Sequence, residues 1–132
     1  MCKEEVLLLF KQIRDSLCTI VTRSIPVNTA DDFTHSPDGM MRLDSICMLL
    51  VTIGEAVKNI DKYTHKSLFS KYPAISWRNV MGLRDIIAHQ YFNVDAEIIL
   101  RIVKVNVPQL QNEINHIIMD LEKDTLEENA DK

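Results

Sequence analysis

Apolar residues recur every three or four positions along most of this chain, and this period constrains the fold more than any other feature. Residues 3–24 show it most clearly, because their apolar side chains form one stripe of a helix and the charged side chains fall outside it. Residues 40–61 repeat the pattern with a broader apolar face. No stretch alternates apolar and polar side chains over the length of a strand. The sequence therefore predicts an all-α fold.

Turn-forming residues interrupt the helical pattern between residues 25 and 40. This segment contains two prolines, three aspartates and a glycine, so we expect a polar loop that is the longest connection of the domain. Residues 64–72 favour a short helical segment. It is expected to end at Tyr72, because a residue that precedes a proline is biased away from helix.

Two polar residues mark the starts of later helices. Ser76 is a good N-cap for a helix over residues 77–91, and Asp95 is a second N-cap for the helix that follows. Pro108 predicts a kink or a restart in that last helix, because an interior proline removes a backbone hydrogen bond. The acid-rich end of the chain from Glu122 is expected to fray.

Length and composition indicate a single domain. The 132 residues can close one hydrophobic core, and a content of only 3 Gly and 4 Pro favours long elements. We expect an antiparallel bundle of four to five helices over residues 1–124, followed by a polar tail, 125–132. Gly54 stands in a helix interior, where glycine costs about 1 kcal/mol relative to alanine, so it predicts the close approach of another backbone.

The cysteines and the N-terminus bear on the cellular compartment. Cys2, Cys18 and Cys47 are odd in number and lack C-x-x-C spacing, which is typical of free thiols in a reducing compartment. Cys18 and Cys47 are expected to be buried on helices. The first residues lack the basic region of a secretory signal, and no run approaches the ~18 apolar residues of a membrane span. We therefore expect a cytoplasmic protein with no membrane segment.

The net charge of −4 argues against a protein that coats nucleic acid, because neutralising phosphates needs a basic surface. A focused RNA site is still compatible with this charge, and DNA is not expected as a partner. The four histidines have no cysteine or carboxylate at zinc-ligand spacing. The sequence also lacks a Gly-rich phosphate loop and a G-x-S-x-G nucleophile motif. We therefore expect neither a metal nor a cofactor.

The stretch 83–91 carries the most chemical information, because Arg84, Asp85, His89 and Tyr91 occur together in an otherwise apolar helix. Arginine has a permanent charge and forked donors that match a phosphate. Histidine, with an ordinary pKa of about 6.5, transfers protons near neutral pH. RNA cleavage by internal transesterification needs these two functions and requires no metal.

The spacing of this pair sets a geometric condition. Arg84 and His89 are five positions apart, which separates them by roughly 140° around a straight helix. They converge if the helix ends or distorts near His89, or if a two-fold dimer brings two copies of each residue to one cleft. The alternative is purely structural: Arg84 pairs with Asp85 at the surface, and His89 and Tyr91 cap an end of the bundle.

At this stretch the sequence resembles a known family. Arg-x-x-x-x-His is the signature of HEPN ribonucleases, and the longer form R-x-x-x-x-H-x-Y, which ends here at Tyr91, is similar to the HepT branch. Three further segments resemble that branch in the right order: I-G-E-A at 53–56, Y-P-x-I-x-W at 72–77 and V-D at 94–95. The resemblance covers roughly residues 4–121.

The resemblance implies a HEPN-like helical bundle, usually a homodimer with its site between the subunits, and metal-independent cleavage of RNA. Arg84 and His89 would be the catalytic residues, with Asp85 as a supporting polar residue. The resemblance also implies a partner, an MNT-type nucleotidyltransferase antitoxin that silences the toxin by adding AMP to Tyr91. A nucleotide two residues from His89 would block the cleft by its bulk and its negative charge.

Two functions are compatible with these patterns. One is an RNA-cleaving toxin that a nucleotidyltransferase regulates. The other is a non-catalytic module that binds a nucleotide or a nucleotidyltransferase, which the acidic balance and the absence of an evident basic stripe favour. Glu55 is either a surface partner of Lys58 or a support of the cleft. Tyr72 and Trp77 are expected to be core or interface aromatics.

Overall fold

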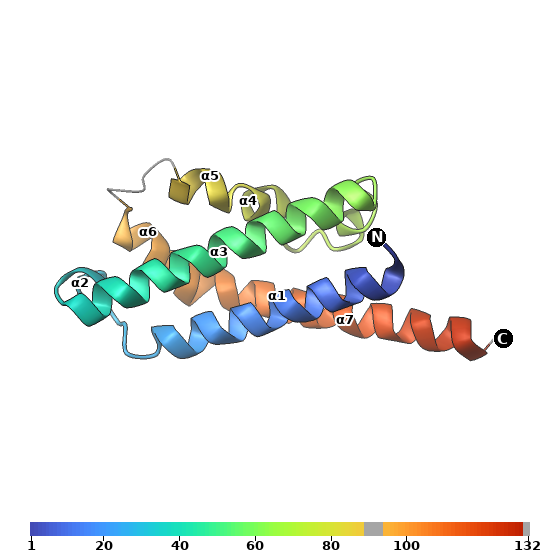
Figure 1. Cartoon of the computed structure of the whole chain (residues 1–132), viewed down its shortest axis with the longest axis horizontal. Helices are drawn as coiled ribbons and strands as arrows, with labels where there is room; N and C mark the ends of the chain where they lie inside the picture. The colour runs from blue at the N-terminus through green and yellow to red at the C-terminus, as the bar shows by residue number, and fades with distance from the viewer. Residues whose placement is uncertain (89–93, 131–132) are drawn as a thin grey trace.

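Three long helices form the body of the molecule. The structure, a computed structural model, describes residues 1–88 and 94–130, and these residues form helices and turns without any strand. The helices α1 (Lys3–Ser24), α3 (Pro37–Tyr63) and α7 (Val107–Ala130) run lengthwise (Figure 1). α1 contacts both α3 and α7 and runs in the opposite direction to them. The predicted all-α antiparallel bundle is confirmed.

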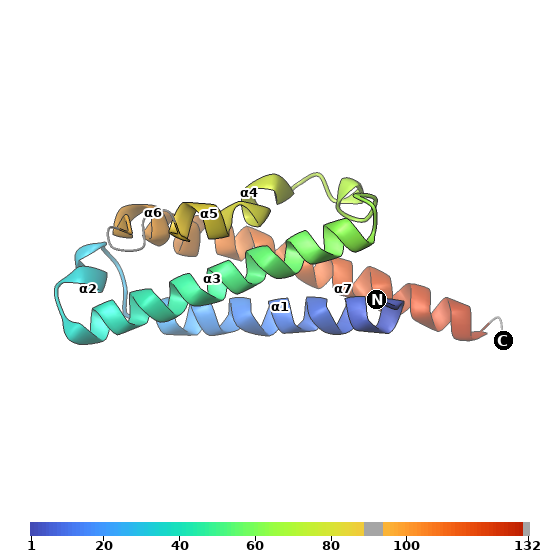
Figure 2. The same ribbon diagram turned by 45° about the horizontal axis from the view of Figure 1, so that its top comes forward.

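A series of short helices makes the fourth arm of the bundle. α4 (Trp77–Met81) and α5 (Leu83–Ala88) follow one another along α3, and we call these two helices the α4–α5 arm. Figure 2 shows them above α3, with α6 (Ala96–Arg101). The prediction of one continuous helix over 77–91 is therefore wrong in its described part, because Gly82 separates α4 from α5.

The core lies between the apolar stripes that the sequence predicts. On α1 the stripe residues Val6, Phe10, Ile13, Leu17 and Ile20 are all buried, and they face buried side chains of α3 and α7. Cys47 is buried as predicted, whereas Cys18 is exposed, so that part of the prediction is wrong. Cys18 follows Leu17 and is turned about 100° away from the buried stripe.

The segment expected as a polar loop over 25–40 contains a short helix. α2 (Asp31–Thr34) buries Phe33 completely, and α3 begins at Pro37 rather than at residue 40. The early start has a local cause in Ser36, whose Oγ accepts a hydrogen bond of 3.0 Å from a backbone N–H of the first turn. Pro37 then occupies the first helical position, where its missing N–H costs no hydrogen bond.

The end of α3 differs from the sequence prediction in a second way. The helical segment expected over 64–72 is only a 3₁₀ turn, Phe69–Lys71. Before it, His65 and Lys66 adopt φ angles of 53° and 64°, in the left-handed region that L-residues rarely occupy. Two successive left-handed residues stop the helix and turn the chain towards α4.

The path into α7 and its far end complete the fold. Asp95 caps α6 as predicted, because its Oδ1 accepts hydrogen bonds from the N–H groups of Glu97 and Ile98. A π-helical turn, Ile102–Asn106, then stands where Pro108 predicted a kink or restart. The expectation that the chain frays from Glu122 is wrong, since α7 continues to Ala130 and its acidic residues form ion pairs with lysines of α1.

No helix formed by residues 1–88 and 94–130 is long and apolar enough to cross a membrane.

Candidate functional site

The candidate site is built on a close contact between α3 and the α4–α5 arm at Gly54. A Cβ atom at this position would lie 2.8 Å from the carbonyl oxygen of Val80 and 3.4 Å from the Cβ of Leu83. The arm therefore rests on α3 at the one turn that presents no side chain to it, as the sequence predicted. This contact brings the backbone of Arg84 next to Glu55, the residue that follows Gly54.

Arg84 and Glu55 form an ion pair across this contact. The Arg84 guanidinium donates from Nη1 to Oε1 of Glu55 over 3.4 Å, and the two side chains are 59% and 38% exposed. An exposed pair of this kind contributes about 0–1 kcal/mol to stability. Among the described residues, Glu55 is the sole hydrogen-bond partner of the guanidinium, so most of its donors face solvent.

The alternatives for surface pairing are thereby corrected. Arg84 pairs with Glu55 rather than with Asp85, since the contact at Gly54 brings Glu55 within reach of the guanidinium. Glu55 in turn reaches across to Arg84 rather than along its own helix to Lys58. Asp85 is exposed on α5 and forms no ion pair within the part of the chain that the structure describes.

His89 and Tyr91 lie outside the described residues. The last described residue of α5 is Ala88. The convergence of Arg84 with His89, and the part played by Tyr91, therefore stay predictions.

Aromatic residues hold the start of α4 in place, and α4 leads to the candidate site on α5. The indole Nε1 of Trp77 donates to the carbonyl oxygen of Tyr72 over 2.8 Å, and the Trp77 ring packs on Phe69 with centroids 4.3 Å apart. The Tyr72 hydroxyl donates to Oδ2 of Asp120 on α7 over 2.7 Å. The prediction that Tyr72 and Trp77 serve the core is confirmed. Ser76 precedes α4 as predicted but its side chain makes no capping hydrogen bond.

A groove of about 590 Å³ lies between α4 and α5 on one side and α6 and the start of α7 on the other. Leu83 and Ile86 line one wall and Ile98 and Ile102 the other, and none of the lining residues that the structure describes is ionisable. Among the described residues, the lining of the groove therefore includes no group for proton transfer. The sequence did not predict it, because it depends on how two arms pack and not on the period of either segment.

Among the described residues, no other reactive groups form a second centre. Burial raises the pKa of the Cys47 thiol to about 11, so the thiol stays protonated near neutral pH. Within residues 1–88 and 94–130, no three His, Cys, Asp or Glu side chains are grouped so that they could hold a metal ion.

Comparison with known proteins assigns a family. The family model described as "Ribonuclease HepT-like" matches residues 15–117. "Putative RNase MJ0125" of Methanocaldococcus jannaschii is 38% identical over 79 residues, which are 60% of this chain and 65% of the relative. "Putative RNase TTE0752" of Caldanaerobacter subterraneus subsp. tengcongensis is 27% identical over 101 residues, 76% of this chain and 84% of the relative. "Probable ribonuclease HepT" of Thermococcus cleftensis is 34% identical over 73 residues, 55% and 63% of the two chains.

The extent of these matches differs between the comparisons. The chain covers 57–65% of the length of three Methanocaldococcus jannaschii relatives. No solved structure matches it significantly. The family model, however, spans most of the 132 residues and includes the Gly54 contact, the Arg84–Glu55 pair and the whole R-x-x-x-x-H-x-Y motif. The chain belongs to the Ribonuclease HepT-like family.

Proposed function

We propose that this chain is a metal-independent endoribonuclease, the toxin of a toxin–antitoxin pair, with Arg84 and His89 as its catalytic residues. The observation that carries the proposal is the solvent-open guanidinium of Arg84, held loosely by Glu55 at the start of the R-x-x-x-x-H-x-Y motif. Free guanidinium donors match the oxygens of a phosphodiester. The family match supports RNA as the substrate.

The proposed reaction is an internal transesterification. The 2′-oxygen of one nucleotide forms a bond to the adjacent phosphorus, and the bond from that phosphorus to the 5′-oxygen of the next nucleotide breaks. His89 takes the 2′-hydroxyl proton or gives a proton to the leaving 5′-oxygen, and in a dimer its two copies can divide these tasks. Arg84 stabilises the charge on the non-bridging oxygens. The products are a 2′,3′-cyclic phosphate and a 5′-hydroxyl.

Two further residues support the proposed centre. Glu55 directs the guanidinium of Arg84 through their ion pair. Asp85, exposed beside Arg84 on α5, supplies a polar neighbour as the HepT-like motif implies.

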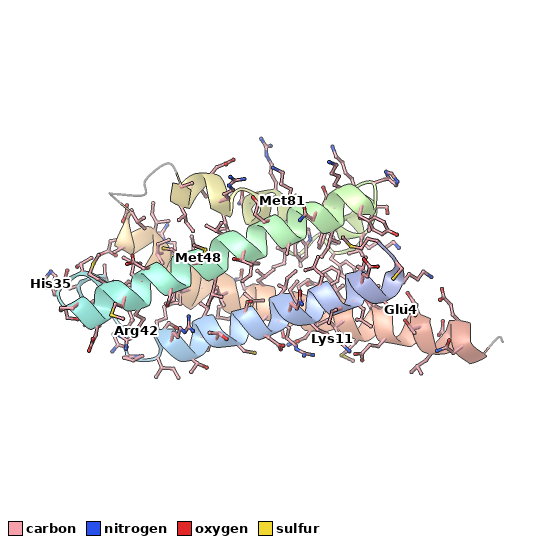
Figure 3. All side chains as sticks on the ribbon, viewed as in Figure 1. Glu4, Lys11, His35, Arg42, Met48 and Met81 are labelled. Atoms are coloured by element: carbon pink, nitrogen blue, oxygen red, sulfur yellow. The ribbon has the colours of Figure 1, made fainter. Side chains whose placement is uncertain are left out.

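The proposed site includes a second copy of the chain. Met41 and Met48 on α3 are 69% and 66% exposed, and successive steps of seven residues lead from Met41 through Met48 to Glu55. Residues seven apart lie on nearly the same helix face, so an exposed apolar stripe runs up to the Arg84–Glu55 pair (Met48 is labelled in Figure 3). A two-fold dimer that packs on this stripe would bring two copies of Arg84 to one cleft. Met48→Glu is expected to yield a monomer in sedimentation.

The proposed regulation is AMP addition to Tyr91 by an MNT-type nucleotidyltransferase. The phenolic oxygen would form a bond to the α-phosphorus of ATP, and pyrophosphate would leave. Tyr91 stands two residues after His89, which supports the proposal because an added phosphate would repel RNA at that point. Co-expression with such an enzyme should add the mass of one AMP to the wild-type chain and none to Tyr91→Phe.

Cleavage of a mixed tRNA and messenger RNA pool in EDTA tests the central proposal. The wild-type chain should cleave and leave 2′,3′-cyclic phosphate ends, whereas His89→Ala and Arg84→Ala should not. His116→Ala is the matched control, because this exposed histidine lies on α7 and pairs only with Glu113 among the described residues. If the folded wild type cleaves no RNA but binds a nucleotidyltransferase, the proposal of a ribonuclease toxin is wrong and the chain is a non-catalytic binding module.

A further inference from the structure

The charges of this acidic chain are unevenly distributed. Residues 55–84 contain six of the fifteen Lys and Arg but only two of the nineteen Asp and Glu, so this segment carries +4. The other residues, with nine cations and seventeen carboxylates, carry −8. The positive segment runs from the last turns of α3 through α4 to Arg84, so the basic surface is joined to the candidate site.

Three of these cations lie along the edge where α3 and α4 meet, and we call Lys58, Lys62 and Arg78 the cationic strip. Lys58 and Lys62 follow Gly54 by four and eight residues, which places them on the side of α3 that carries α4. Arg78 is in the first turn of α4, and all three side chains are exposed.

The strip cations differ from the cations of α1 in their pairing. Lys3, Lys11 and Arg14 each form an ion pair with a carboxylate. The three strip side chains form none with any carboxylate of the described residues. Neither carboxylate of the segment forms an ion pair with the strip, since Glu55 pairs with Arg84 and Asp61 forms no ion pair with any described residue.

Helix stability explains only one of the three cations. Lys62 lies in the last turn of α3, where a positive charge is favoured by the helix dipole. Lys58 precedes that turn, and Arg78 lies in the first turn of its helix, where a cation gains nothing from the dipole. Exposed, unpaired cations beside a phosphate-binding arginine suit a ligand that carries a row of negative charges.

We propose that the cationic strip binds the phosphodiester backbone of single-stranded RNA next to the phosphate that Arg84 holds. This inference rests on the proposed function, because it takes Arg84 as the residue at the scissile phosphate. The seven residue steps from Glu55 to Lys62 span about 10 Å of helix axis. This length is close to the Debye length of about 10 Å at 0.1 M salt. The electric fields of the strip and of Arg84 therefore overlap, and both attract the phosphates of one RNA chain.

Contacts of this kind define a class of substrate. Phosphate contacts position a strand but carry no base information. The strip therefore predicts binding of single strands several nucleotides long, with little preference for base sequence, and lengthens the footprint beyond the scissile bond.

The salt dependence of binding tests the strip. The probe is a fluorescent 2′-O-methyl RNA oligomer, which cannot be cleaved because it lacks the attacking hydroxyl. For single strands the slope of log affinity against log salt becomes shallower by about 0.7 for each phosphate that the protein no longer neutralises. The double variant Lys58→Ala/Lys62→Ala should therefore have a slope shallower by about 1.4, and Arg78→Ala by about 0.7.

A control with the same change of charge separates the strip from net charge. Arg23→Ala/Lys123→Ala removes two exposed cations from α1 and α7 and should keep the wild-type slope. Equal slopes for the two double variants, or a wild type that does not bind the oligomer, would overturn the proposal. If the strip variant instead loses only its complex with a nucleotidyltransferase, the surface belongs to that partner. If the wild type binds the oligomer with the expected slope but cleaves no RNA in EDTA, the proposed cleavage is wrong and the proposed RNA binding by the strip stands.

Discussion

Nη1 of Arg84 and Oε1 of Glu55 lie 3.4 Å apart and join two segments that are 29 residues apart in the sequence. Because both side chains are partly exposed, this pair adds little to the stability of the fold. We expect it to bias the direction of the guanidinium, which has no other hydrogen-bond partner among the described residues. The carboxylate also competes with a phosphate for the same donors.

Substitution of Glu55 should separate these two effects. Glu55→Ala removes the acceptor, so the guanidinium is no longer directed and kcat should fall roughly tenfold. Glu55→Gln keeps an acceptor oxygen but removes the negative charge, so kcat should stay near wild type and KM should fall, because the RNA phosphates meet less repulsion. Steady-state cleavage of one defined oligonucleotide measures both constants. Identical behaviour of the two variants would refute a positioning role for Glu55.

The contact at Gly54 should be sensitive to a single methyl group. The Cβ of Gly54→Ala would lie 2.8 Å from the Val80 carbonyl oxygen, a backbone atom that cannot move away without a shift of α4. We expect a decrease of about 1–3 kcal/mol in the free energy of unfolding, measured with urea, together with weaker cleavage because α5 and Arg84 move away from Glu55.

Gly82→Ala is the matched control for Gly54→Ala. At Gly82 the φ angle is −82°, and the nearest atoms to a new Cβ lie at 3.4 and 3.6 Å. This variant should be neutral or gain up to about 1 kcal/mol, since alanine favours helix over glycine. Equal decreases at both glycines would show that the close approach to Val80 has no special cost.

The long helices could be predicted because each keeps a continuous apolar face, which depends only on local sequence. The breaks could not be predicted as well. A glycine such as Gly82 is tolerated within many helices. The separation of α4 from α5 depends on how both helices rest on α3. The turn-forming residues around Phe33 predicted a loop. The burial of Phe33 on α2, which contacts α3 and α6, is a tertiary effect that local sequence does not show. The start of α3 could have been predicted, since Ser36 followed by Pro37 is a local N-terminal signal.

The candidate site could be predicted in its motif but not in its electrostatics. The chemistry of Arg84 follows from its residue type, whereas its exposure and its pairing with Glu55 require the structure. The cationic strip was missed, because a net charge of −4 averages over the whole chain. A charge count over 55–84 alone would have found it.

Two helix starts offer a direct comparison of capping. Asp95 accepts hydrogen bonds from two N–H groups of α6, and Ser76 makes no side-chain capping bond to α4. Asp95→Ala should therefore cost about 1 kcal/mol in the free energy of unfolding, and Ser76→Ala close to nothing. Urea unfolding of both variants at one pH is sufficient. A decrease at Ser76 equal to that at Asp95 would contradict the assigned caps.

The hydroxyl of Tyr72 should make a contribution to stability that depends on pH. Tyr72→Phe removes its bond to Asp120, and we expect a decrease of about 1–2 kcal/mol in the free energy of unfolding between pH 7 and 9, since a bond to a charged acceptor is stronger than a neutral one. Tyr63→Phe is the control, because Tyr63 is 43% exposed and its hydroxyl bonds to no described residue.

At alkaline pH this difference should shrink. Burial and the Asp120 carboxylate raise the pKa of the Tyr72 phenol above its ordinary value of about 10. The folded protein thus keeps this proton at a pH where the unfolded chain has lost it. The stabilisation is complete below about pH 10 and is lost as the pH rises through the pKa of the folded state. Unfolding curves between about pH 8 and 11 should show wild-type stability falling faster than that of Tyr72→Phe, and parallel curves would place the phenol in an ordinary aqueous environment.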